Sequence, residues 1–387
     1  MEGLRRDADR LGPEIVAWRR HLHRRPELGF EERLTAAFVA ERLRGLGLEV
    51  RTAIARTGVV ALLAARKGSQ PPILLRADMD ALPIQEEPGP EYGSEIAGIM
   101  HACGHDGHVA MLLGAASLLA SRREALSRDV AFCFQPAEEG LGGARRMIEE
   151  GVLELTGARS AFALHLWTPY AAGTLHVRPG AMMAAQDEFA ATVAGRGGHG
   201  AEPHRAADPL VAAAQGVVGL QTVVSRSVDP MDPAVLTVGS FHAGSAPNVI
   251  PGEARLHGTL RSFREEVREL LRDRVREVLE GTSRAGGCRV DLEIRPGYPV
   301  AVNDGAAVER MIRAGTAVLG PENVIESPPL AASEDFAYFL REVPGAIALL
   351  GAALPGPGRP HHSAGFDFDE SVLARGAEIL ARLALEP

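Results

Sequence analysis

Lysine and cysteine are both scarce in this chain. Among 387 residues there is a single lysine, Lys67, and there are three cysteines, Cys103, Cys133 and Cys288. Cysteines that are so few and so far apart do not form the framework of a small disulfide-rich protein, and they suit a reducing compartment. Arginine therefore carries nearly all the positive charge, which we interpret as genome composition rather than mechanism.

The chain also has no long apolar run and no excess of positive charge. Its N-terminal segment is charged and lacks the apolar core of a signal peptide, and no later stretch has the length of a membrane span. A formal net charge of −9 argues against a nucleic acid or an anionic membrane as partner. We therefore expect a cytoplasmic protein that binds neither.

The length of 387 residues exceeds the size at which one hydrophobic core stops growing, so two domains are expected. Residues 1–182 and 297–387 alternate apolar strands with helices, which predicts an α/β domain with a mixed, mostly parallel sheet. Residues 183–296 carry a β-α-β-β-α-β order, which is typical of a ferredoxin-like α+β domain. The second domain would be an insertion into the first.

Chemically reactive residues follow the apolar strands expected in the first domain. Strands are predicted at residues 73–77, 130–134 and 161–164, and helices at residues 108–121 and 144–150. The strands lead into Asp78 and Asp80, into Glu138 and Glu139, and into His165. Because ligands bind beyond the carboxyl ends of parallel strands, we expect these side chains to lie together.

The stretch from Met100 to His108 concentrates metal-binding side chains. It contains three histidines, one cysteine and one aspartate, and Cys103 and His105 stand two positions apart. Thiolate and imidazole are ligands of divalent transition metals. A loop that merely carries histidines before a helix is the alternative, and it would be the better explanation of a single histidine. The combination of residue types favours a metal site.

Further candidates come from distant parts of the chain. The histidine pair His361–His362 follows an apolar strand predicted at residues 346–350. These candidate ligands come from distant parts of the chain and leave one carboxylate over. A structural zinc site, by contrast, is closed by four ligands. Of Glu138 and Glu139, one could bind metal while the other takes a proton from metal-bound water, whose pKa can fall to about 7. This arrangement predicts hydrolysis of a carbonyl compound by metal-bound hydroxide.

Eight segments make the prediction more specific. They are RRHLHRRPELGFEE (19–32), RADMDALP (76–83), MHACGHDGH (100–108), FQPAEEG (134–140), GRGGHGAEPH (195–204), NVIP (248–251), SEDFAYF (333–339) and HHS (361–363). Together they resemble the di-metal amidohydrolases that cleave N-acyl amino acids, which include hippurate hydrolases, aminoacylase-like enzymes and plant hydrolases of auxin conjugates. The resemblance spans nearly the whole chain. It implies a zinc-peptidase-like catalytic domain with an inserted lid and dimerisation domain.

The resemblance also implies a set of site residues. Two divalent metal ions per subunit would be held by Cys103, His105, Glu139, His165 and His362. Cys103 would bridge the ions, and Glu138 would be the general base and proton shuttle. Asp80, and similarly Asp78, would orient the ligands without binding metal.

The choice of His362 over His361 follows the family pattern, in which the ligand is followed by a serine, here Ser363. That pattern usually continues with proline, whereas this chain has Ala364. Zinc, manganese, cobalt and nickel are all compatible with the ligand types. His101, Asp106 and His108 would support the ligands or begin the following helix.

Three residues of the inserted domain complete the expected site. His199 is implied to stabilise the tetrahedral oxyanion, often in the active site of a partner subunit. Asn248 and Arg261 are expected to contact the free carboxylate of the substrate, because a guanidinium group suits a carboxylate. A homodimer or homotetramer through the lid domain is expected from the role of His199 and from the edge strands that an inserted sheet would offer.

The expected activity is hydrolysis of the amide bond of an N-acyl L-amino acid, with an acetyl, benzoyl or similar acyl group. A dipeptidase or carboxypeptidase acting on short peptides is the alternative, although such relatives usually carry His-x-Asp where this chain has Asp78-Met79-Asp80 and an aspartate at the Cys103 segment. A third hypothesis is a metal-free binding or scaffold protein, against which the intact ligand set and Glu138 count. With two Trp and four Tyr, the sequence does not specify the acyl group.

Overall fold

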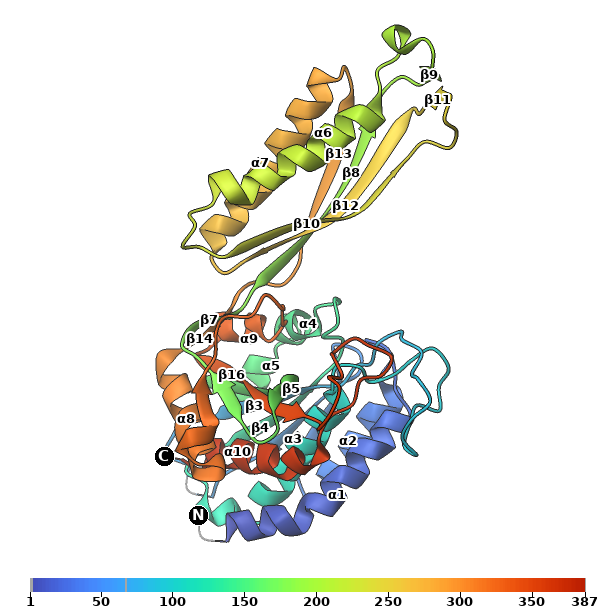
Figure 1. The fold of residues 1–387 in the computed structure, drawn as a ribbon. Helices are drawn as coiled ribbons and strands as arrows, with labels where there is room; N and C mark the ends of the chain where they lie inside the picture. Colours follow the sequence, from blue (N-terminus) through green and yellow to red (C-terminus); the bar gives the residue numbers. More distant parts are fainter. Residues whose placement is uncertain (1–2, 67, 387) are drawn as a thin grey trace. The chain divides into compact units, whose positions relative to one another are not determined.

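In the computed structural model, which describes residues 3–66 and 68–386, the chain forms two compact units (Figure 1). The first unit comprises residues 1–182, 302–328 and 335–387, and the second comprises residues 183–301 and 329–334. The inserted domain was predicted to end at residue 296, whereas the second unit continues to residue 301 and also includes residues 329–334.

The first unit contains an eight-stranded sheet in the order β1-β2-β4-β3-β5-β16-β6-β15. Its strands are β1 (Glu49–Ile54), β2 (Gly58–Leu63), β3 (Ile73–Asp78), β4 (Val130–Gln135), β5 (Ser160–Ala171), β6 (Leu175–Val177), β15 (Val324–Glu326) and β16 (Gly345–Ala353). The pairs β4–β3, β3–β5, β5–β16 and β6–β15 are parallel, and the pairs β1–β2, β2–β4 and β16–β6 are antiparallel. The predicted mixed, mostly parallel sheet is confirmed.

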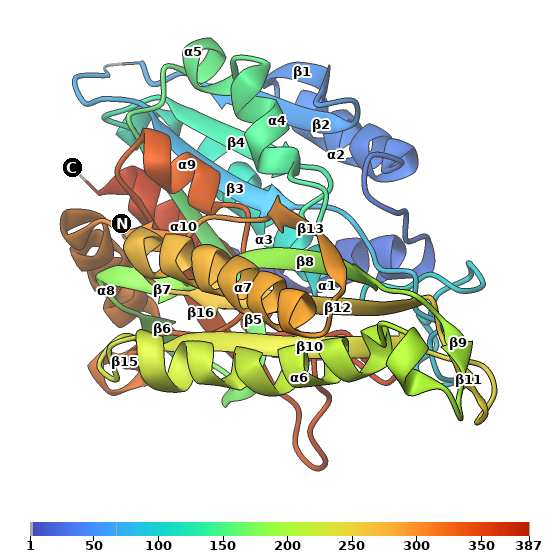
Figure 2. The same ribbon diagram turned by 90° about the horizontal axis from the view of Figure 1, so that it is seen from above.

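Helices cover both faces of this sheet (Figures 1 and 2). One layer contains α1 (Leu4–Arg24), α2 (Arg33–Gly45), α3 (His105–Ala120), α8 (Gly305–Leu319) and α10 (Leu373–Leu385), and the other contains α4 (Gly143–Glu149), α5 (Val152–Thr156) and α9 (Ala337–Glu342). With both faces covered, β3 and β4 are buried along their whole length. The apolar strands predicted before Asp78 and before Glu138 are thus central strands of the core.

Two element boundaries that position the site differ from the prediction. Helix α3 begins at His105, not at residue 108, because Gly104 adopts a left-handed φ of 86° and starts the helix there. Strand β5 does not end before His165 but continues to Ala171. Its last pair with β3 is Arg76 with Ala163, so His165 projects from β5 at the level where β3 ends.

The second unit has the predicted β-α-β-β-α-β order. Its elements are β8 (Ala185–Ala194), α6 (Pro209–Thr222), β10 (Ala234–Ala243), β12 (Glu253–Ser262), α7 (Glu265–Ala285) and β13 (Arg289–Pro296), and the antiparallel sheet runs β10-β12-β8-β13 with both helices on one face. This topology is ferredoxin-like. Buried Asp187 on β8 bonds Arg268 and Arg272 of α7, each at 2.6 Å, which ties the helix to the sheet.

Short strands complete the fold. Strands β9 (Gly198–His199) and β11 (Val249–Ile250) pair with each other, and strands β7 (Gly180–Met183) and β14 (Ala301–Asn303) lie where the chain passes between the units.

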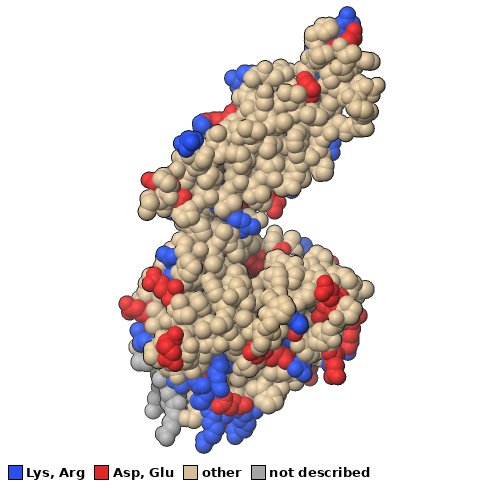
Figure 3. Space-filling model, in the orientation of Figure 1, with Lys and Arg blue, Asp and Glu red and all other residues tan. Residues whose placement is uncertain are grey.

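On the face shown in Figure 3, acidic and basic side chains are interspersed. Within residues 3–66 and 68–386, no helix combines the length and the apolarity that a membrane crossing requires.

Candidate metal centre

The five predicted metal ligands come together at one edge of the first unit's sheet. Cys103 and His105 lie at the start of α3, Glu139 in the turn after β4, His165 on β5 and His362 in the loop after β16. The Cys103 Sγ is 3.7 Å from His165 Nε2, and His362 Nε2 is 3.1 Å from Glu139 Oε1. His105 Nε2 lies 4.0 Å from the same Glu139 oxygen. Segments far apart in sequence thus supply one cluster.

The ligand atoms form two groups that share Cys103. One group is Cys103, His105 and His165, and the other is Cys103, Glu139 and His362, with the ligand atoms of each group within 4.8 Å of one another. A thiolate that belongs to both groups suits a bridging ligand. The buried His105 Nε2 also finds no hydrogen-bond partner within the described part of the chain. Because such atoms are costly to bury alone, these residues fit a divalent cation.

Electrostatics within the cluster couple metal binding to proton release. Burial and the charge of Glu139 raise the pKa of the Cys103 thiol, and hydrogen bonds to Cys103 and Glu139 raise the pKa of His362 to about 10. Burial and the charge of His108 hold the pKa of His165 well below its usual value. Since metals bind thiolate and neutral imidazole, Cys103 and His362 would have to lose protons if they were to bind a metal ion.

A neighbouring cluster of Asp78, His105 and His108 is engaged in hydrogen bonds instead. Asp78 accepts from Arg76 at 2.7 Å and lies 2.6 Å from His108 Nδ1, while His108 Nε2 accepts the Leu166 amide at 2.8 Å. Burial alone would raise the pKa of Asp78, but the charges of Arg76 and His105 hold it well below its usual value. Because hydrogen bonds occupy both ring nitrogens of His108, this cluster is a poor metal site.

Two buried carboxylates hold the turn that carries Glu138 and Glu139. Asp80 accepts the backbone amide of Glu138 at 3.0 Å and that of Glu139 at 2.9 Å. Glu32 accepts the amide of Ala137 at 2.8 Å. Ala137 has a φ of 55°, a left-handed conformation that is strained for a residue with a side chain. Three consecutive amides bonded to carboxylates fix the turn, and Asp80 accepts two of them.

Glu138 is supported by residues to which the sequence analysis gave no role. The Asp335 amide donates to Glu138 Oε1 at 3.3 Å. The Asp335 carboxylate in turn accepts from Arg76 at 3.0 Å, from Gln135 at 2.7 Å and from the Ala144 amide at 2.9 Å. Arg76, Gln135 and Asp335 all lie within the noted motifs, and that membership was the only signal in the sequence that pointed to them.

The three candidates of the second unit do not form one group. His199 lies on β9, which pairs with β11 directly after Asn248, so these two are neighbours. Arg261 lies opposite Gln186 near the far end of β12, eight residues from Glu253 at its start. Eight residues of strand span roughly 26 Å at about 3.3 Å per residue. Asn248 precedes β11, which lies beyond the Glu253 end of β12 (Figure 1), so Asn248 and Arg261 lie toward opposite ends of the sheet and we do not expect one second unit to bring both to the carboxylate of one small substrate.

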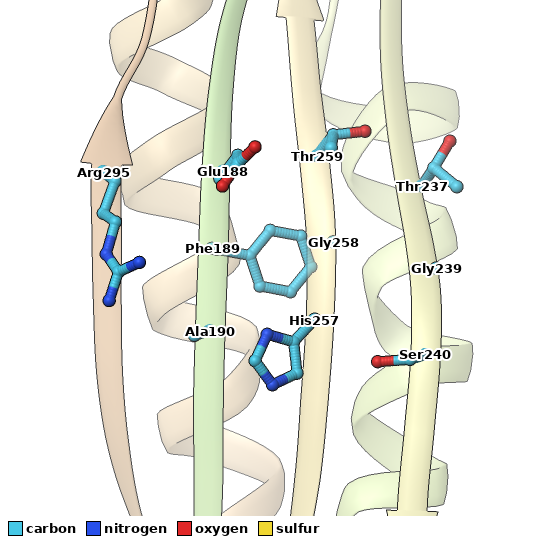
Figure 4. Close-up of a pocket in the computed structure, with 10 residues that line it drawn as sticks. All are labelled: Glu188, Phe189, Ala190, Thr237, Gly239, Ser240, His257, Gly258, Thr259 and Arg295. Carbon is cyan, nitrogen blue, oxygen red and sulfur yellow. The ribbon is translucent and has the colours of Figure 1, made fainter. Parts of the chain in front are cut away.

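A separate hollow of about 430 Å³ lies on the face of the second unit's sheet opposite the helices. Figure 4 shows its lining, which includes Glu188, Thr237, His257 and Arg295. None of the predicted site residues contributes to it, so we do not assign the hollow to the candidate centre.

Comparisons with known proteins find relatives that match most or all of the chain. A family model described as peptidase family M20/M25/M40 matches residues 74–386. The chain is 43% identical over 305 residues to the N-acyl-L-amino acid amidohydrolase of Geobacillus stearothermophilus, a match that covers 78% of this chain and 81% of that protein. It is 37% identical over 392 residues to thermostable carboxypeptidase 2 of Saccharolobus solfataricus, covering 100% of this chain and 98% of that protein. A crystal structure of Bacillus subtilis YxeP also matches, and it is described as a dinuclear metal binding peptidase from the M20 family. The TM-score is 0.84 at 33% sequence identity, and the match covers 97% of this chain and 98% of that chain.

The Asp80→Asn substitution tests whether Asp80 fixes the turn that carries Glu138 and Glu139. An asparagine keeps one acceptor oxygen but presents an NH₂ group to the second amide, so Glu139 would shift. We expect metal affinity to fall by about 10–100-fold, measured by metal titration of the purified protein. Asp129→Asn is the matched control, since it makes the same exchange at a carboxylate that accepts the Ala65 amide at 2.8 Å outside the cluster. Equal affinity in both variants would contradict the assignment.

Proposed function

Because the chain belongs to peptidase family M20/M25/M40, we propose that it hydrolyses the amide bond of N-acyl L-amino acids at a two-metal centre. The products are a carboxylic acid and a free amino acid. The observation that carries this proposal is the pair of ligand groups that share Cys103. The similarity to an N-acyl-L-amino acid amidohydrolase supports the substrate class, and the similarity to YxeP supports two ions.

The proposed metal ligands are the clustered side chains already described, namely Cys103, His105, Glu139, His165 and His362. When bound, the ions would lower the pKa of a water molecule and polarise the acyl carbonyl. Cysteine and histidine favour zinc, and the carboxylate also accepts manganese, cobalt or nickel.

Glu138 is the proposed general base. One of its carboxylate oxygens lies within 4.8 Å of the ligand atoms of His105 and Glu139, close enough to take a proton from a water molecule held there. Glu138 then passes this proton to the leaving amine. His199 stabilises the negative charge that develops on the acyl oxygen, because a positioned donor is most effective where charge appears.

We further propose that the protein is a homodimer or homotetramer formed by the second unit. Strand β10 is an edge strand of its sheet, and Val211 and Val218 on α6 are exposed apolar side chains. The positions of Asn248 and Arg261 toward opposite ends of the sheet support a site in which Arg261 comes from one subunit and His199 and Asn248 come from its partner. The substrate is a small molecule in this proposal.

Hydrolysis of short peptides is the second candidate function. The similarity to thermostable carboxypeptidase 2 favours it. A cysteine at position 103 and the Asp78-Met79-Asp80 motif favour the amidohydrolase instead, because peptidases of this kind usually have an aspartate and a His-x-Asp motif there. The amidohydrolase therefore remains the better supported function.

Two adjacent substitutions separate proton transfer from metal binding. Glu138→Gln should retain two metal ions and lower kcat by about 10²–10⁴-fold, because the general base is lost. Glu139→Gln, the matched control next to it, should lose metal because a ligand is lost. Turnover and metal content are measured on the same samples. A fully active Glu138→Gln protein would refute the mechanism.

A substrate panel distinguishes the two candidate functions. N-acetyl, N-benzoyl and N-indoleacetyl amino acids are compared with dipeptides that carry the same C-terminal residue, each with defined metals. We expect kcat/KM to be at least tenfold higher for one N-acyl class, because removing the charged amino group of a dipeptide from water costs free energy that a neutral acyl group does not cost. A preference for dipeptides would favour the alternative.

His199→Ala should lower kcat by about 10²–10³-fold, because a donor to the oxyanion is lost. His204→Ala, in the same loop, is the control and should stay near wild type.

Mixing inactive His199→Ala with inactive Glu138→Gln and allowing subunits to exchange should restore about a quarter of wild-type activity if His199 acts on the partner's site. Mixtures that stay inactive after proven exchange would place His199 in its own subunit's site.

A further inference from the structure

His361 precedes the proposed ligand His362 and belongs to no ligand group described above. Its ring stacks on Trp167 of β5, with centroids 4.7 Å apart and planes at 28°, and lies 5.0 Å from the ring of Phe366. Aromatic contacts on two sides hold the imidazole in one place. The position of its two nitrogens is therefore set by packing.

The hydrogen bonds of His361 determine which nitrogen carries the proton. The Thr168 amide donates to His361 Nε2 at 3.2 Å. A ring nitrogen that accepts a hydrogen bond carries no proton, so the proton of this imidazole lies on Nδ1. Nδ1 in turn is 3.7 Å from Cys103 Sγ, which is within reach of an N–H···S hydrogen bond.

We propose that His361 is a positioning residue whose Nδ1–H donates a hydrogen bond to the thiolate of Cys103. The inference rests on the proposed two-metal centre, in which Cys103 would be a ligand. The donor stabilises negative charge on sulfur and fixes the direction of the Cys103 side chain, as outer hydrogen bonds do for other metal ligands. Because Nδ1 is protonated, His361 supports a ligand and does not bind metal itself.

The test compares His361→Leu with His361→Asn in the full-length protein loaded with Co²⁺. Asparagine places an N–H group close to the position of Nδ1, and leucine has nearly the same shape without a donor. Loss of the donor raises the energy of the sulfur electrons, so the thiolate-to-cobalt charge-transfer band should move to longer wavelength in His361→Leu. The band of His361→Asn should stay near wild type. Metal content should stay at two ions, and the affinity of His361→Leu should fall by about tenfold.

Other outcomes overturn the inference. An unchanged band in His361→Leu would show that no hydrogen bond reaches the sulfur, and loss of one cobalt ion would make His361 a ligand. If His361→Leu fails to fold, His361→Gln provides the same comparison, because its amide extends toward the position of Nε2 and leaves Sγ without a donor. A wild-type protein without the charge-transfer band would remove Cys103 from the ligand set, which refutes the proposed centre itself.

Discussion

Hydrogen bonds from three consecutive amides to buried carboxylates are the constraint on which the candidate centre depends. Adjacent side chains of an extended chain point to opposite sides, yet the carboxylates of Glu138 and Glu139 both lie within 4.8 Å of His105. Asp80 and Glu32 hold the amides of this turn, and Ala137 takes a left-handed φ of 55° there. The strained turn therefore brings the carboxylates of two neighbouring glutamates to one place.

Buried ion pairs support both this turn and the start of α3. Arg76 bridges Asp78 and Asp335, and Asp335 supports Glu138 through its amide. At the start of α3, fully buried Arg19 bonds Asp106 at 2.8 Å, next to the candidate ligand His105. A buried charge is tolerated only when it is paired, so each pair fixes the geometry of its partners. Charges that surround the ligands thus help to position them.

Much of the fold could be predicted because the apolar pattern is local. The strand before Asp78 and the strand before Glu138 are buried on both faces, and their continuous apolar runs reveal this. The end predicted for β5 was wrong because His165 interrupts the apolar pattern. The strand continues because Leu349 of β16 pairs with His165, a contact that no local pattern encodes. The start of α3 was misplaced because the left-handed Gly104 begins the helix three residues early.

The sequence by itself determined the residue types of the site, because thiol, imidazole and carboxylate groups in a fixed order restrict the chemistry to metal-dependent hydrolysis. Only the tertiary structure decided which of these groups meet. It places Cys103 in both candidate ligand groups, brings His361 to the Cys103 sulfur and sets Arg261 at the end of β12 that is far from Asn248. The physical reason is that such distances depend on strand register and on the packing of segments far apart in the chain, which residue spacing does not contain.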